Sequence, residues 1–212
     1  GEVNTLNIYD EITDSAAAGT AMATGNKVKN SVISQQIPGD GSDLTTIVET
    51  AKGIGASTGL VTTTTISHAT PATFGAHVPN RANYQDIILD YLSETKPNVL
   101  LGGAQYIDPS TAHSAGYTVV EDYDDLISTN TETESMVWGQ FGETHLPFEW
   151  DGLGNLPHLS EATQFAIDIL DNDPDGFFLM VEGGRIDHAG HSNDIQRNIY
   201  ETIEFSKAVE TV

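Results

Sequence analysis

Cysteine is absent from the 212 residues of the chain. Its absence excludes a disulfide framework and a thiolate metal site, so a metal ion would have to be bound by oxygen atoms and imidazoles. The sequence also has no long apolar run, which excludes a membrane-spanning helix. The first residues, GEVNTLNIYDE, lack the basic start and apolar core of a signal peptide.

Basic residues are scarce, with 8 Lys and Arg against 31 Asp and Glu and a formal net charge of −23. A surface this acidic repels nucleic acids and anionic membranes, so neither is expected as a partner. The acidic excess has three candidate causes: a salt-tolerant (halophilic) origin, cation binding, or disorder. Disorder is the weakest of them because apolar periodicity is strong outside 121–135.

Helix and strand patterns are expected to alternate along the chain. Small residues predict a helix over 14–24 that ends at Gly25, and apolar spacing predicts another that begins at the N-cap Asp43 and closes at Gly53 and Gly55. Further helices are predicted at 84–94 and 162–170, and strands at 60–64, 98–101, 136–141 and 177–181.

Continuous apolar strands between amphipathic helices favour a mostly parallel sheet that is covered on both faces. The predicted fold class is therefore α/β, a three-layer α/β/α sandwich, in one domain that spans 1–212. Residues 105–160 contain acidic and Asn/Thr-rich stretches and are expected to form a connecting region.

The segment VEGGRIDHAGHSND at 181–194 indicates a metal site. It places carboxylates and imidazoles on one short stretch that follows a strand, and these are ligands for zinc or a harder cation. Asp187 and His191 are four residues apart, so on a helix both side chains share one face and could bind one ion. The structural alternative is a polar helix start with Asp187 as its cap.

Ser15 opens a run of small residues after Asp14. At the first turn of a helix, free backbone N–H groups and the positive end of the dipole would lie beside its hydroxyl, an arrangement that suits phosphate. Ser15 could then attack phosphorus. The alternative is that Asp14 or Ser15 only caps the helix.

The segment from His68 to Arg81 carries a third group of polar residues. The Thr70 hydroxyl could bind a metal or its water, and the guanidinium of Arg81 could hold two phosphate oxygens. An isolated arginine of this kind can also form an ordinary surface ion pair.

In combination, these segments resemble the alkaline phosphatase family. The patterns found there in the same order are T-D-S-A-A-x-x-T-A-x-x-T-G at 13–25, A-T-P-A at 69–72, A-H-V-x-x-R at 76–81, L-G-G-A at 101–104, G-F-F-L-x-V-E-G at 176–183 and V-E-G-x-x-I-D-x-x-x-H at 181–191. The resemblance covers nearly the whole chain.

The resemblance implies hydrolysis of small phosphomonoesters through a phosphoserine intermediate, with Zn²⁺ and Mg²⁺ as cofactors. Ser15 matches the nucleophile, Arg81 the arginine that holds the phosphate oxygens, and Asp14 the residue that orients this arginine. The positions that match metal ligands or their neighbours are Asp187 and His191 for zinc, Thr70 and Glu182 for magnesium, and His68 and His188 beside the metals. The family also implies a homodimer that is periplasmic or secreted.

Two features of the family have no counterpart in this sequence: an aspartate in a D-G-M-G-like motif before Thr13, and a further D-H pair with a later histidine after the segment at 181–191. The chain is therefore expected to be an interior portion of a larger enzyme. Its sheet would be incomplete at both ends, and alone it would bind metals weakly and show little activity.

Two other functions stay open. A phosphodiesterase or sulfatase-like relative is disfavoured because those enzymes place a threonine or a modified residue where Ser15 stands. An acidic, non-catalytic cation-binding module is favoured by the net charge and the missing ligands.

Overall fold

The computed structural model describes residues 4–212 and divides the chain into two compact units. Unit 1 combines the residues up to Gly55 with Ser67–Lys96, and unit 2 combines Ala56–Ile66 with Pro97–Val212. The prediction of one catalytic domain over the whole chain stays a prediction. Within residues 4–212, every helix is too short or too polar to cross a bilayer.

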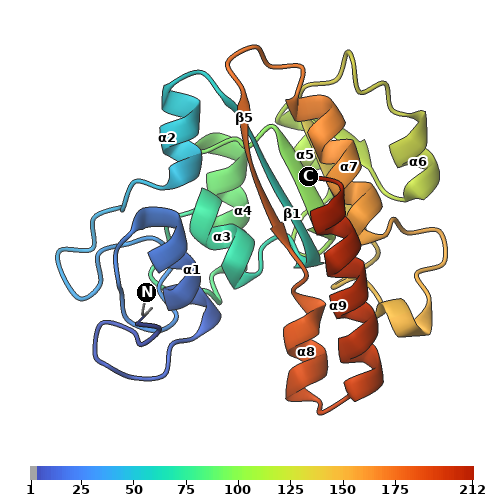
Figure 1. Cartoon of the computed structure of the whole chain (residues 1–212). Coiled ribbons are helices and arrows are strands. Elements are labelled where there is room, and N and C mark those ends of the chain that lie inside the picture. Colours follow the sequence, from blue (N-terminus) through green and yellow to red (C-terminus); the bar gives the residue numbers. More distant parts are fainter. Residues whose placement is uncertain (1–3) are drawn as a thin grey trace. The chain divides into compact units, whose positions relative to one another are not determined.

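Unit 1 is helical (Figure 1). Its helices are α1 (Ser15–Thr24), α2 (Ile47–Gly53), α3 (Ala69–Gly75) and α4 (Tyr84–Ser93). The predicted end of α1 is confirmed, because Gly25 takes the left-handed conformation with φ 75° and closes the helix. The predicted N-cap at Asp43 is wrong: Thr46 caps α2 through a reciprocal capping box with Glu49, which satisfies two backbone N–H groups at once.

Unit 2 contains a five-stranded sheet in the order β3-β4-β2-β1-β5, with every neighbouring pair parallel. Its strands are β1 (Ser57–Thr65), β2 (Val99–Gly103), β3 (Thr118–Val120), β4 (Val137–Phe141) and β5 (Phe177–Glu182). Its helices are α5 (Pro109–Ser114), α6 (Tyr123–Ser128), the 3-10 turn η1 (Glu149–Asp151), α7 (Leu159–Leu170), α8 (Arg185–His191) and α9 (Ile195–Glu210). The α/β class and the parallel sheet are confirmed.

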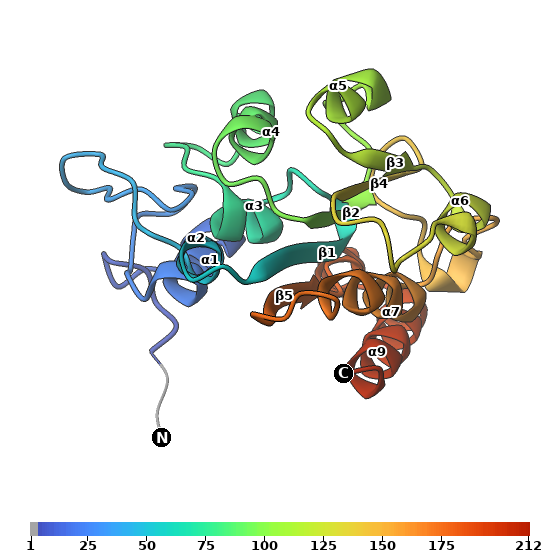
Figure 2. The same ribbon diagram turned by 90° about the horizontal axis from the view of Figure 1, so that it is seen from above.

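The core of unit 2 lies between the sheet and α7. Phe165, Ala166 and Ile169 of α7 are buried against strand residues such as Leu101 and Phe141, and α9 packs outside α7 (Figures 1 and 2). Burial of these side chains supplies the main stabilising free energy, about 1.5–3 kcal/mol for each large apolar side chain.

The predicted connecting region 105–160 has more regular structure than its composition indicates. It contains α5, β3, α6, β4 and η1, and β3 extends the sheet by pairing with β4. β3 is only three residues long and lies among polar residues, which is why no apolar run marks it. The strand expected at 136–141 is confirmed as β4.

Candidate active site

The nucleophile candidate Ser15 is the first residue of α1, at the end where backbone N–H groups have no partner within the helix. Asp14 is the N-cap, and its Oδ1 accepts a hydrogen bond from Ala17 N at 2.9 Å. Its Oδ2 accepts another from Ser31 N at 3.0 Å. Asp14 therefore does cap the helix, and the cap fixes its carboxylate directly beside Ser15.

Arg81 contacts this carboxylate within unit 1. Its Nη1 lies 3.3 Å from Asp14 Oδ2, and its Nη2 lies 3.3 Å from His68 Nε2. The backbone N–H of Arg81 donates to the carbonyl of Ser31 at 2.7 Å. Three of the predicted site residues, Asp14, His68 and Arg81, are thus brought together, and both ends of the guanidinium are oriented by protein atoms.

Thr70 is the second residue of α3 and is half-buried. Helix α3 packs tightly on α1 at Gly19, where a Cβ would stand 2.4 Å from Thr73 Oγ1. The Thr73 hydroxyl in turn donates to the carbonyl of Thr70 at 2.7 Å. Gly19 permits the close approach of the two helices, and this contact fixes the start of α3 relative to α1. Thr70 is held in place by the same contact, through its hydrogen bond with Thr73.

Glu182 is the last residue of β5, in unit 2. It is paired in register with Thr62 of β1, so both side chains leave the same face of the sheet. The Thr62 hydroxyl donates to Glu182 Oε2 at 2.6 Å, a length typical of a hydrogen bond to a carboxylate.

The zinc-ligand candidates lie on α8. Asp187 Oδ2 and His191 Nε2 are 3.4 Å apart on one helix face, as the four-residue spacing predicts. The two side chains are 64% and 80% exposed. Asp187 lies in the first turn of α8, whose N-cap is Gly184, so the alternative of Asp187 as cap is wrong.

His188 was predicted from the sequence as a site residue, but the two residues that it contacts, Arg185 and His145, were not. Its Nδ1 lies 2.8 Å from Arg185 Nη1, and its ring lies 4.6 Å from the ring of His145. Burial first, and then electrostatic interaction with His188 and Arg185, lowers the pKa of His145 to about 4. His145 is therefore neutral at physiological pH, and its Nδ1 accepts from Thr65 N at 2.9 Å. His145 lies in the predicted connecting region 105–160, and no sequence motif there marks it as a site residue.

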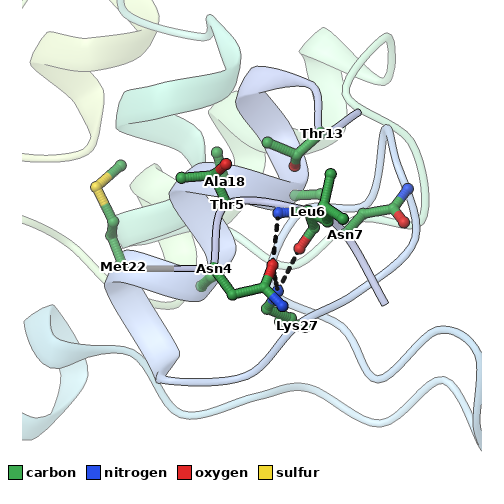
Figure 3. A pocket seen from close by; sticks show the side chains of 10 residues that line it. Asn4, Thr5, Leu6, Asn7, Thr13, Ala18, Met22 and Lys27 are labelled. Atoms are coloured by element: carbon green, nitrogen blue, oxygen red, sulfur yellow. Dashed lines mark hydrogen bonds between the residues drawn. The ribbon is translucent and has the colours of Figure 1, made fainter. Parts of the chain in front are cut away.

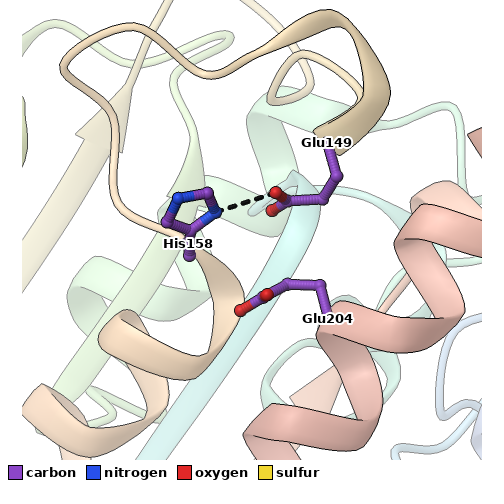
Figure 4. A group of neighbouring side chains, drawn as sticks. All are labelled: Glu149, His158 and Glu204. Carbon is purple, nitrogen blue, oxygen red and sulfur yellow. Dashed lines mark hydrogen bonds and ion pairs between the residues drawn. The ribbon is translucent and has the colours of Figure 1, made fainter.

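A second group of potential metal ligands was also missed. Glu149, His158 and Glu204 each place one ligand atom within 4.8 Å of the others (Figure 4). His158 Nδ1 lies 2.8 Å from Glu149 Oε2, and Ser160 donates to Glu204 through its backbone N–H and its hydroxyl. Two of the three side chains stand in the 105–160 region and the third on α9, a helix for which no pattern was identified above.

A pocket of about 440 Å³ lies against α1 in unit 1 (Figure 3). Its lining is mainly apolar and includes Leu6, Ala18 and Met22, with Lys27 bonded to Asn4 and to the carbonyl of Leu6 at its rim. None of the predicted site residues is among those that line it. The pocket therefore does not mark the candidate chemistry.

Comparison with known proteins gives consistent matches. A family model described as alkaline phosphatase matches residues 1–107 and 100–212. Alkaline phosphatase 3 of Bacillus subtilis (strain 168) is 42% identical over an alignment of 209 residues, with 93% of this chain and 44% of that protein covered. The alkaline phosphatase of Escherichia coli (strain K12) is 30% identical over 256 residues, with 95% of this chain and 54% of that protein covered.

Solved structures agree with these relatives. The cold-active alkaline phosphatase of the psychrophile Shewanella sp. has a TM-score of 0.92 and 38% identity, covering 100% of this chain and 53% of that one. A mutant of TAB5 alkaline phosphatase with Mg bound in its M3 site has a TM-score of 0.87 and 29% identity, covering 100% of this chain and 62% of that one. The chain thus spans about half the length of the proteins that it matches.

Proposed function

Since the chain belongs to the alkaline phosphatase family, we propose that it carries part of a phosphomonoesterase site in which Ser15 is the nucleophile. Ser15 Oγ would form a bond to phosphorus as the ester oxygen leaves with the alcohol. Water would then attack the phosphoserine, releasing phosphate and regenerating the serine hydroxyl. The substrates would be small phosphomonoesters.

The observation that carries this proposal is the arrangement around Asp14. The residue that caps α1 next to Ser15 also contacts Arg81 at 3.3 Å. A phosphoryl group at Ser15 would meet the N-terminal N–H groups of α1 and a guanidinium whose orientation is already set. Both stabilise the negative charge that phosphate brings, and the fixed orientation reduces the entropy lost on binding.

The donor set on the chain fits the proposed metals. Asp187 and His191 offer an oxygen and an imidazole nitrogen from one helix face, which suits zinc. Glu182 in unit 2 and Thr70 in unit 1 each offer an oxygen of the kind that magnesium binds. When bound, these ions would supply Lewis acidity that lowers the pKa of bound water and stabilises the leaving oxygen. His68 and His188 would support neighbouring groups, His68 through Arg81 and His188 through Arg185.

Further expectations follow from family membership. We propose that the whole protein is a homodimer that acts in the periplasm or outside the cell. The 212-residue chain alone is expected to be inactive or weakly active.

The proposal is tested with the full-length protein and a Ser15→Ala variant, loaded with zinc and magnesium. We expect the wild type to hydrolyse a chromogenic phosphomonoester in preference to a diester, and to yield a phosphorylated Ser15 when quenched in acid and examined by mass spectrometry. Ser15→Ala should lose the covalent phosphate and at least about a thousandfold in kcat. Full activity in Ser15→Ala, or a preference for diesters, would contradict the proposal. The same assay on the isolated chain measures its residual activity.

A further inference from the structure

Strand β1 ends in four consecutive threonines, Thr62 to Thr65, and all four are buried. Buried hydroxyl groups are normally hydrogen-bonded, because an unsatisfied one costs free energy. In unit 2 the run faces the end of β5 and the start of α8: Thr62 bonds to Glu182, and Thr63 Oγ1 accepts from Arg185 N at 3.1 Å. These hydroxyls thus contact the segment that carries the proposed metal ligands.

The hydroxyl of Thr62 has one direction in which it can donate. A hydroxyl offers one proton and two acceptor lone pairs. Thr62 Oγ1 accepts from Thr64 N at 3.1 Å and lies 2.9 Å from Thr64 Oγ1. An ionised carboxylate can only accept, so the proton of Thr62 points to Glu182 Oε2. The Thr64 hydroxyl has two acceptors within reach, Thr62 Oγ1 at 2.9 Å and the carbonyl of Thr65 at 3.3 Å. The glutamate therefore sets the direction of the Thr62 hydroxyl.

Gly184 leaves the space that this arrangement needs. A Cβ at this position would stand 2.5 Å from Thr64 Cγ2 and 3.0 Å from Glu182 Oε2. The backbone at Gly184 is ordinary for a helix, with φ −67° and ψ −20°, so the conformation does not require glycine. Its missing side chain is required by the packing against Thr64 and Glu182.

We propose that Thr62 is a positioning residue that fixes the carboxylate of Glu182 for a divalent cation. This inference rests on the proposed function, in which Glu182 is a magnesium ligand. A ligand that is already hydrogen-bonded in one orientation loses less entropy on binding a metal, and loss of such an outer contact typically weakens metal affinity about 10–100-fold.

The test uses Thr62→Val, which removes the hydroxyl and keeps the shape of the side chain, in the full-length protein. Thr58→Val is the matched control, because Thr58 lies on the same strand, is fully buried, and its Oγ1 makes no hydrogen bond within residues 4–212. Mg²⁺ affinity is measured by titration calorimetry on protein with zinc already bound, with Glu182→Gln identifying the binding event that involves Glu182. Thermal unfolding without metal reports whether each variant is folded.

We expect Thr62→Val to weaken Mg²⁺ binding about 10–100-fold, Thr62→Ser to restore it, and Thr58→Val to leave it unchanged. If Glu182→Gln weakens Mg²⁺ binding and Thr62→Val does not, the positioning role is wrong while the proposed ligand stands. If Glu182→Gln leaves Mg²⁺ binding unchanged, the proposed ligand itself is wrong, and the inference falls with it. Equal loss in Thr62→Val and Thr58→Val would indicate a general packing effect and would also overturn the inference.

Discussion

Unit 2 holds two groups of acidic side chains that differ in the burial of their carboxylates. Asp187 and His191 on α8 are largely exposed and contact each other at 3.4 Å. The second group, called the buried group below, comprises the carboxylates of Glu149, Glu201 and Glu204. Glu201 and Glu204 of α9 are each 3% exposed, and Glu204 accepts hydrogen bonds from Ser160 and Lys207. Carboxylates are therefore well hydrated in one group and largely removed from water in the other.

Because of this difference in burial, the two groups of acidic side chains are expected to affect the protein in different ways. An exposed pair is solvated by water, so changing it costs the fold little and affects mainly what binds there. A buried group loses hydration, so its charges must be compensated by donors, counter-charges or protonation, and the fold depends on that compensation. The exposed pair should therefore control the affinity for zinc. The buried group should control the free energy of unfolding of the metal-free protein.

The largest effect is expected from Asp187→Asn, which weakens a proposed zinc ligand at an exposed position. Zinc affinity should fall by more than about 100-fold, since even outer contacts of a metal site are worth 10–100-fold. The free energy of unfolding without metal should stay within about 0.5 kcal/mol of the wild type. Competition titration with a zinc chelator measures the affinity, and Asp168→Asn, an exposed acid on α7, is the control. Equal zinc affinity in the two variants would show that Asp187 is not a zinc ligand.

A smaller effect, on stability alone, is expected from Ser160→Ala in the buried group. The serine hydroxyl donates to Glu204 Oε1 at 2.5 Å, and losing a hydrogen bond to a buried charge costs about 1–2 kcal/mol of the free energy of unfolding. Ser192→Ala, at the exposed end of α8, removes a hydroxyl bonded to His188 O and should cost less than about 0.5 kcal/mol. Urea unfolding with a chelator present compares the two, and equal losses would contradict the contrast between the groups.

The sequence alone predicted structural features that depend on neighbouring residues along the chain, such as the ends of α1. Asp14 and Gly25 have the side chains that begin and end helices, so α1 was placed correctly. For α2 the sequence predicted Asp43 as N-cap, and this was wrong: Thr46 is the N-cap because Glu49 completes its capping box.

The parts that were missed depend on contacts between distant residues. Thr62 and Glu182 are 120 positions apart, and only the register of β1 and β5 joins them. Glu201 and Glu204 face the core from α9, and nothing in their neighbours along the chain marks them as buried. Strand register and helix packing are set by the tertiary fold, which is why the composition of 105–160 and 195–210 gave no warning of these groups.

The smallest effect is the pH dependence that the buried group contributes through Glu201. Burial, with help from the carboxylates of Glu149 and Glu204, raises the pKa of Glu201 from 4.5 to about 7. Between these two values the folded state retains a proton that the unfolded state has released, so the free energy of unfolding falls as pH rises from 4.5 through 7. Above pH 7 the charge is present in both states and the loss is complete.

Glu201→Gln removes this ionisation and keeps a side-chain oxygen. In the wild type Glu149 N donates to Glu201 Oε1 at 2.8 Å, and the glutamine oxygen can accept the same hydrogen bond. In metal-free buffer the variant should match the wild type at pH 4.5 and exceed its free energy of unfolding by on the order of 1 kcal/mol at pH 8. Because Glu149 and Glu204 remain in both proteins but interact with Glu201, the difference between the two pH profiles reports the ionisation of Glu201 together with its coupling to these two carboxylates. A constant difference across this range would mean that Glu201 is ionised in the folded state at pH 4.5 to 8, and the buried group would then be compensated by its donors rather than by protonation.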